Sequence, residues 1–279
     1  MASPAAILAR GPWPAEAVDA RWSDDPFEPP PEKDAAADAA IAALHERGSP
    51  SHDGVAARLA GYQERDGCLR LDLQPMRWAL RLVADDASHS LAALCVTRRA
   101  DGAWLAGRRA AWLSTWPGRW ALGAGGAVDL GESPVLTLTR ELMEEWALIP
   151  ACTTIEALLR LPHEMVMLVG QAWLAEGAED ALAMDAEHDT FAWWPPDPAD
   201  WPPEGDGPLL RMAALLTSTG DPNLRGSEGE TQPPPSLRGP EGVTSTGDPN
   251  LRGSEGETTT SGGPSLRGPK GETRSPNLQ

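Results

Sequence analysis

The sequence predicts an α/β protein, because strand-like and helix-like segments follow one another through its centre. Two apolar runs typical of buried strands, residues 91–97 and 104–109, precede an amphipathic segment that begins near Pro134. A third apolar run, residues 165–171, follows that segment. Strands on both sides of one helix indicate an α/β fold. A repetitive segment without such patterns begins at Thr217.

Residues 1–87 are expected to form an N-terminal accessory region. Alanine-rich residues 34–47 predict a helix after a proline cluster. Apolar and polar residues alternate over 69–73 and again over 76–82, which predicts two half-buried strands. One helix and two strands are too small for a core of their own. We therefore expect a small α+β extension that packs on the main domain or pairs with a second subunit in a homodimer.

The main domain is expected to span residues 88–216. Besides the three apolar runs, residues 190–194 predict a fourth strand. Residues 208–216 predict a C-terminal helix, because their leucines and methionine offer one apolar side. Cys95 lies within an apolar run and is expected in the core.

The central helix is expected to begin at Ser133 and Pro134, since serine caps free N–H groups and proline suits the first helical position. An apolar stripe with intervals of three and four follows, made by Val135, Leu138, Leu142 and Trp146. Glu141, Glu144 and Glu145 fall on another face, where their charges repel one another. A hard divalent cation such as Mg²⁺ or Mn²⁺ would offset this repulsion, and a solvated acidic surface is the alternative interpretation.

A glycine-rich loop precedes the helix. Its glycines permit backbone conformations and close approaches that side chains forbid, at Gly123, Gly125, Gly126 and Gly131. A strand, a loop of this kind and a helix in succession can receive a phosphate group, although glycines alone more often mark a plain turn.

Residues 126–148 read G-x5-E-x7-R-E-L-x-E-E-x-A-L. This pattern resembles the Nudix box, the signature of the Nudix hydrolases, with Ala147 where the family has a second glycine. The resemblance implies an α/β/α sandwich and a metal-dependent hydrolase that cleaves a diphosphate linkage in a nucleoside diphosphate joined to another moiety. The family's glycine leaves the helix in a left-handed conformation, so we expect an altered exit at Ala147 with the glutamate face intact.

The resemblance also implies roles for single side chains. Glu141, Glu144 and Glu145 would be ligands of Mg²⁺ or Mn²⁺. Glu132 would hold the loop or a water in the outer shell of the metal. Arg140 would orient a neighbouring glutamate, because its guanidinium can pair with a carboxylate through two hydrogen bonds.

Substrate contacts are expected from Gly125 and Gly126 of the loop, from Arg108 and from Trp120. Arg108 would offset the acidity of the chain near the site. The indole of Trp120 would stack on a base or pack in the core.

The general base is expected outside the box, since enzymes of this family often position the attacking water with a further glutamate. Asp185, Glu187 and His188 are the local candidates, and we select Glu187. Glu164 is the second choice for the general base. A charged turn before a strand is the alternative interpretation.

Composition limits the partners. The chain has 41 acidic residues against 23 lysines and arginines and a net charge of −18. Such a chain repels polymeric nucleic acid and anionic membranes, so we expect a small-molecule diphosphate as partner, no nucleic acid and no membrane. No apolar run long enough for a membrane span and no signal peptide is seen, and the three cysteines fit reduced thiols. We therefore expect a cytoplasmic protein.

Two other classes stay open. Isopentenyl-diphosphate isomerases share the fold and a Pro-Gly-x-Trp approach like residues 117–120. They need a cysteine and glutamate pair, and the absence of cysteine between Val96 and Cys152 disfavours this class. A ligand sensor that has lost catalysis is disfavoured by the intact glutamates and Arg140. No second motif names the leaving group.

Residues 217–279 are expected to be a disordered tail. Residues 217–231 recur intact as 244–258, and proline, glycine, serine, threonine and charged residues dominate the segment. This composition cannot bury enough apolar surface to offset the entropy of ordering. The tail is either an interaction segment or an extension without a stable fold.

Overall fold

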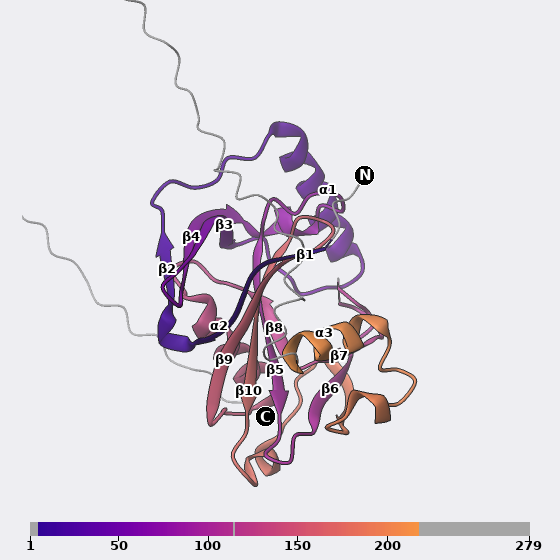
Figure 1. Ribbon diagram of the computed structural model, residues 1–279. Coiled ribbons are helices and arrows are strands. Elements are labelled where there is room, and N and C mark those ends of the chain that lie inside the picture. The colour runs from indigo at the N-terminus through magenta and orange to yellow at the C-terminus, as the bar shows by residue number, and fades with distance from the viewer. Residues whose placement is uncertain (1–4, 114, 218–279) are drawn as a thin grey trace, which may run out of the picture. The chain divides into compact units, whose positions relative to one another are not determined.

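The architecture is built on a mixed sheet with one helix on each face (Figure 1). The computed structural model describes residues 5–113 and 115–217, so the predicted tail, apart from Thr217, lies outside the described residues. Within that range the helices are α1 (Pro31–Glu46), α2 (Pro134–Trp146) and α3 (Gly207–Thr217). The strands are β1 (Ala6–Pro14), β2 (Val18–Trp22), β3 (Val55–Arg65), β4 (Cys68–Arg77), β5 (Leu91–Arg98), β6 (Trp104–Arg109), β7 (Trp120–Leu122), β8 (Ala124–Ala127), β9 (Cys152–Arg160), β10 (Val166–Trp173) and β11 (His188–Trp194).

The main sheet has the strand order β1-β9-β10-β5-β6-β11, with β8 paired to β5 and β7 paired to β6. The central strands β5 and β10 run parallel, from Leu91 opposite Val166 to Arg98 opposite Trp173, and the other neighbours are antiparallel. Both faces of this parallel pair are covered, which explains why β5 and β10 are continuous apolar runs in the sequence. The four strands predicted for this domain are confirmed.

The two faces of the main sheet are covered by different helices. Leu138, Leu142 and Trp146 of α2 are fully buried on one face, as the apolar stripe predicts. Leu209 and Ala213 of α3 pack on the other face. The α/β/α sandwich and the predicted C-terminal helix are therefore confirmed. No helix among the described residues is long and apolar enough to cross a membrane.

A second, smaller sheet of order β2-β4-β3 is built from the N-terminal region. The alternating Leu69, Leu71 and Leu73 of β4 turn inward and share a core with α2. The strand predicted over 76–82 is wrong in its second half, because Trp78–Leu82 forms the short 3₁₀ helix η2. Two consecutive residues of η2, Ala79 and Leu80, are both buried against α1, which a strand with alternating faces would not allow.

The N-terminal region also contributes to the main sheet. Residues 6–14 form β1, which pairs antiparallel with β9 and places Trp13 opposite Ile155. The sequence analysis did not find this strand. The region before residue 88 therefore supplies an edge of the main sheet as well as the smaller sheet and α1.

The exit of α2 keeps a left-handed backbone although glycine is missing. Ala147 has φ 55° and ψ 29°, and its N–H donates to the carbonyl of Met143 at 2.9 Å. The altered exit expected at this position is therefore not observed. An alanine in this conformation is strained relative to glycine by about 1 kcal/mol.

Replacing Ala147 with glycine is expected to stabilise the fold by about 0.5–1 kcal/mol and to raise the melting temperature by a few degrees. Thermal unfolding followed by circular dichroism checks this. The matched control is Ala39→Gly on the exposed side of α1, which is expected to lower the melting temperature. A decrease for both variants would show that no strain is stored at Ala147.

Candidate active site

The end of strand β8, just before the loop to α2, places backbone directly against a carboxylate. A side chain at Gly126 would meet the Glu141 Oε1 at 2.2 Å, so only glycine leaves room for Glu141 here. Gly126 also pairs with Ala93 of β5, which fixes its backbone in the sheet. Ser133 caps the helix, since its hydroxyl accepts from the N–H of Val135 at 3.3 Å. The loop and the start of α2 are thus held in one geometry.

Arg140 lies at the centre of the acidic side chains. It donates to both carboxylate oxygens of Glu132, at 3.0 and 3.1 Å, and to Glu141 Oε1 at 2.7 Å. It also donates to Glu144 Oε2 at 2.9 Å and to the carbonyl of Ala127 at 3.1 Å. Burial lowers the pKa of Arg140, but the hydrogen bond with Glu132 and the charge of Glu141 outweigh it, so its pKa lies above the ordinary value. Arg140 orients the carboxylates through hydrogen bonds.

Glu132 is engaged within the loop. Besides Arg140, its Oε2 accepts from the Thr137 hydroxyl at 2.7 Å and from the Asp129 N–H at 3.3 Å. Burial raises the pKa of Glu132, but the hydrogen bonds from Arg140 and Thr137 bring it below the ordinary value. From the small sheet, the indole of Trp22 donates to the carbonyl of Glu132 at 3.0 Å. These contacts favour the loop-holding role of Glu132 over direct metal ligation.

Glu145 is a buried carboxylate with one unpaired oxygen. Its Oε1 accepts from the N–H of Gly125 at 2.9 Å, whereas its Oε2 has no hydrogen-bond partner in the described part of the chain. The buried imidazole of His188 lies nearby, with its Nε2 3.7 Å from Oε2, and burial lowers the pKa of His188. Burial raises the pKa of Glu145 well above its ordinary value, and the charges of Glu141 and Glu187 raise it further. Burial also raises the pKa of Glu141.

These carboxylates fit a hard divalent cation in chemistry but are not yet arranged as ligands. Within residues 5–113 and 115–217, no three His, Cys, Asp or Glu side chains already form a metal-binding group. Arg140 holds Glu141 and Glu144 in hydrogen bonds, and more than half of the Glu144 side chain is exposed. The Oε2 of Glu145 has no hydrogen-bond partner in the described part of the chain, and the raised pKa of this carboxyl marks negative charge that no hydrogen-bonded cation compensates. A cation with oxygen ligands would compensate it.

The structure brings Glu187 to this site and leaves Glu164 outside it. Glu187 precedes β11, its Oε2 is 3.7 Å from Arg109 Nη2, and its charge acts on Glu141 and Glu145. Burial raises the pKa of Glu187. Glu164 instead pairs with residues at the other end of β9 and β10. Of the other local candidates, Asp185 and His188 pair with each other.

The structure therefore separates the candidates for the general base by position. Asp185 Oδ1 lies 3.3 Å from His188 Nδ1 and accepts from the N–H of Glu187 at 2.9 Å. Asp185 and His188 thus support the turn that carries Glu187.

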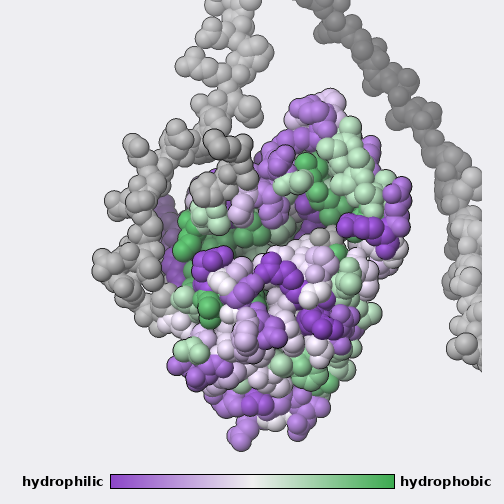
Figure 2. All heavy atoms as spheres, turned by 90° about the vertical axis from the view of Figure 1, so that its right-hand side faces the viewer, coloured by the Kyte–Doolittle hydropathy of each residue, from purple (hydrophilic) through white to green (hydrophobic). Residues whose placement is uncertain are grey.

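A cavity of about 690 Å³ lies between the main sheet and α3 and reaches the glycine loop at Gly125 and Gly126. Figure 2 shows the face that carries α3, where hydrophobic residues gather in a hollow. Apolar side chains form most of the wall, among them Leu94, Leu122, Leu159, Met165, Met167 and Met212. Its described charged residues and its histidine are Arg81, Arg109, Arg160, His163 and Arg211. Among the described lining residues there is no aspartate or glutamate.

Two expected substrate contacts do not line this cavity. Arg108 points to the other face of β6 and lies 3.5 Å from Asp189. Trp120 packs with its ring centre 5.5 Å from that of Trp194. The neighbouring Arg109 lines the cavity instead, as the alternation of side chains along β6 requires. Alternation along the predicted strand shows that Arg108 and Arg109 face opposite sides, but not which one faces the cavity.

Comparison with known proteins gives one family. The family model described as the NUDIX domain matches residues 88–214. Similar solved structures include a MutT protein from Methanosarcina mazei, with 22% identity over 37% of this chain and 75% of that chain and a TM-score of 0.31. An Ap4A hydrolase from C. elegans has 21% identity over 46% of this chain and 92% of that chain, with a TM-score of 0.35.

A NUDIX-family hydrolase from Clostridium perfringens has 16% identity over 46% of this chain and 97% of that chain, with a TM-score of 0.32. No curated protein matches the chain. All of these TM-scores lie below 0.5, so the solved structures are not used to infer function. Membership of residues 88–214 in the NUDIX family is given by the family model and agrees with the residues of α2 and its loop.

Proposed function

Residues 88–214 of this chain form a domain of the Nudix hydrolase family, and from that premise we propose that the protein is a metal-dependent pyrophosphohydrolase. Its substrate would be a nucleoside diphosphate joined to another moiety, cleaved at the diphosphate linkage. The observation that carries this proposal is the acidic face of α2. There Glu145 is buried and Glu141 is partly buried, their pKa values are raised, and Glu145 Oε2 has no hydrogen-bond partner in the described part of the chain.

In this proposal Glu141, Glu144 and Glu145 hold Mg²⁺ or Mn²⁺. When bound, such a cation would supply charge neutralisation for the phosphates and a more acidic water for the attack. Arg140 keeps Glu141 and Glu144 in place through its hydrogen bonds, and Glu132 holds the loop against the helix. Carboxylate oxygens and a divalent cation suit each other because both are hard.

Glu187 is proposed as the general base. An ionised carboxylate near the metal face can take the proton that the attacking water loses. Burial moves the pKa of Glu187 upward, toward the range in which such a transfer is efficient, while the nearby Arg109 favours its ionised form. Asp185 supports this position by accepting from the backbone N–H of Glu187.

The cavity beside the loop is proposed to hold the organic part of the substrate. Its volume of about 690 Å³ is that of a small-molecule site. The apolar wall suits a base or another flat or aliphatic group, and the arginines suit phosphate. In an acidic chain this concentration of arginine in one cavity gives an anion a local site that the rest of the surface does not offer.

The isomerase alternative has less support in this site. It needs an acidic cysteine next to the reacting carbon. Cys95 is buried in the core, and burial raises its pKa to about 12. Cys68 and Cys152 are exposed and do not line the cavity.

The cytoplasmic location and the homodimer stay predictions.

A panel of compounds with a diphosphate linkage, incubated with Mg²⁺ and separated by chromatography, tests the proposed function. The panel holds nucleotide sugars, dinucleotides, ADP-ribose, oxidised nucleoside triphosphates and coenzyme A. We expect at least one compound to give two products and EDTA to stop the reaction. Binding of a compound without any product would favour the ligand sensor instead.

A further inference from the structure

Arg81 lines the cavity although it lies outside the NUDIX domain. The domain match begins at residue 88, and Arg81 belongs to η2 (Trp78–Leu82) of the N-terminal region. The same cavity is lined by Gly125 and Gly126 of β8 and by Arg109 of β6. One arginine from the N-terminal region therefore faces the same space as the glycines of the NUDIX domain.

Arg81 has no acidic partner in the described part of the chain; its guanidinium lies 5.4 Å from the ring centre of Trp78. In the described part of the chain its guanidinium makes neither a hydrogen bond nor an ion pair, although it is half-buried. Four residues earlier, Arg77 is held by Asp34, Asp38 and Asp53 at 2.5 to 2.7 Å. In a chain with a net charge of −18 partners are abundant. A half-buried guanidinium without one is costly unless an anion from solution pairs with it.

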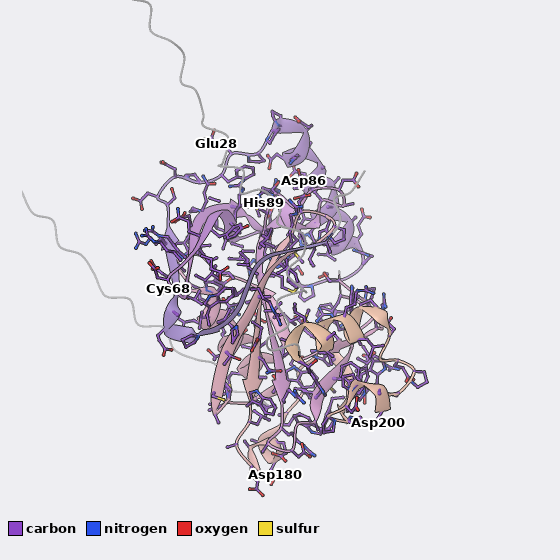
Figure 3. All side chains as sticks on the ribbon, viewed as in Figure 1. Glu28, Cys68, Asp86, His89, Asp180 and Asp200 are labelled. Atoms are coloured by element: carbon purple, nitrogen blue, oxygen red, sulfur yellow. The ribbon has the colours of Figure 1, made fainter. Side chains whose placement is uncertain are left out.

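The segment that carries Arg81 is held firmly. Ala79 and Leu80 are fully buried against α1. Trp78 and Ala79 are fixed by backbone N–H groups that donate to the Gly54 carbonyl at 2.8 Å and to the Asp53 carboxylate at 3.0 Å. The loop after η2 is tied to α1 by the ion pair of Lys33 with Asp86. Figure 3 labels Asp86 and the nearby His89 of this loop. A fixed backbone on both sides of Arg81 limits where its guanidinium can lie.

The electrostatic neighbours of Arg81 place it next to the reaction site. Burial lowers the pKa of Arg81 and the charge of Arg109 lowers it further, whereas the charges of Glu141 and Glu187 raise it. Glu141 belongs to the metal face, and Glu187 is the proposed base. Arg81 thus lines the cavity and also lies close enough to Glu141 and Glu187 for their charges to act on it.

We propose that Arg81 is a substrate-binding residue that pairs with the phosphate oxygens of the diphosphate, so that the N-terminal region completes the active site of the NUDIX domain. The guanidinium fork matches two phosphate oxygens at once, which a lysine cannot do. This inference rests on the proposed function. It also gives the N-terminal region a role: η2, packed on α1, adds a fourth arginine to the three that the domain places along the cavity.

Titration calorimetry with imidodiphosphate, a diphosphate analogue that is not hydrolysed, tests the proposal in the presence of Mg²⁺. Arg81→Met is expected to weaken binding about 10- to 100-fold, because a charged hydrogen-bonding group is removed. Arg81→Lys is expected to lose less. The control Arg65→Met removes an exposed arginine of the same region and is expected to bind like the wild type.

Two further measurements separate a binding role from a structural one. Without an anion, the melting temperature of Arg81→Met is expected to equal or exceed that of the wild type, since the variant removes a half-buried charge and loses only the contact with the Trp78 ring. Binding of Mn²⁺ alone is expected to be unchanged, because Arg81 is not a metal ligand. Guanidinium ion added to Arg81→Ala is expected to restore part of the affinity for imidodiphosphate, which loss of packing would not allow.

The proposal is overturned if Arg81→Met binds imidodiphosphate as tightly as the wild type, or if the wild type does not bind it at all. Should Arg81→Met fail to fold, Arg81→Gln gives the same comparison with a polar side chain of similar length. If the proposed hydrolase function itself is wrong, the measurements give a different result. In that case the wild type binds no Mn²⁺ and hydrolyses no compound of the panel, whatever Arg81 contributes to anion binding.

Discussion

Glu145→Gln is expected to lower turnover about a hundredfold or more and, without metal, to raise the melting temperature. The amide keeps the shape of the side chain but removes a negative ligand, and the lost charge stabilisation corresponds to at least about 3 kcal/mol of activation free energy. Glu144→Gln is expected to lower turnover similarly. Because more than half of the Glu144 side chain is exposed, the melting temperature of Glu144→Gln should differ little from that of the wild type.

The expected gain in stability follows from the pKa of Glu145. Burial places this pKa in the folded state well above the ordinary value. The ionised form therefore destabilises the fold above the ordinary carboxyl pKa, and glutamine removes that cost at neutral pH. As pH falls through the raised pKa, the wild-type carboxyl takes up a proton. The difference in melting temperature between wild type and Glu145→Gln should then disappear.

Metal addition is expected to reverse the order of the two melting temperatures, so that the wild type becomes the more stable protein. Mg²⁺ or Mn²⁺ is expected to raise the melting temperature of the wild type, because a ligand that binds only the folded state stabilises it, and to raise that of Glu145→Gln much less. Glu176→Gln, an exposed change outside the site, is the matched control. Near-normal turnover of Glu145→Gln together with a wild-type response to metal would remove Glu145 from the metal site.

Arg140→Met is expected to destabilise the fold by about 3 kcal/mol and to abolish turnover. Arg140 is the cation that donates to Glu132, Glu141 and Glu144, so its loss leaves these carboxylates without their counter-charge. A loss of this size lowers the melting temperature by roughly 10 °C in a domain of this size. The loss should shrink at low pH, where Glu132 and Glu141 are protonated.

The control for Arg140 is Arg21→Met, which removes an arginine paired only with Asp19 and more than half exposed. Exposed pairs of this kind contribute about 0–1 kcal/mol. Equal melting temperatures for the two variants would mean that Arg140 is an ordinary surface arginine, and the stated role in ordering the carboxylates would be wrong.

The helix α2 and its loop could be predicted from the sequence because their signals are local. Spacing of three and four identifies the buried stripe, and Ser133 and Pro134 identify the start of the helix. The position of Ala147 could also be predicted, but its left-handed backbone could not. The surrounding packing imposes that conformation on a residue that would otherwise avoid it.

The elements that were missed depend on distant partners. Strands β7 and β8 have only three and four residues, and β8 contains two glycines, so pairing with β6 and β5 and not propensity makes them strands. The alternation that continues from β4 into residues 78–82 looks like a strand, but packing on α1 bends these residues into η2. Arg81 reaches the site only through that packing, so no local pattern could reveal it.

The reaction in ¹⁸O-enriched water tests the hydrolase assignment most directly. With Mg²⁺ and an active compound of the panel, we expect mass spectrometry to find a single heavy oxygen in one product and none in the other, because water displaces one phosphoryl group from the other. Chelation of the metal should abolish this gain. An intact diphosphate that takes up solvent deuterium at carbon, in a parallel reaction in heavy water, would contradict the hydrolase assignment and establish an isomerase.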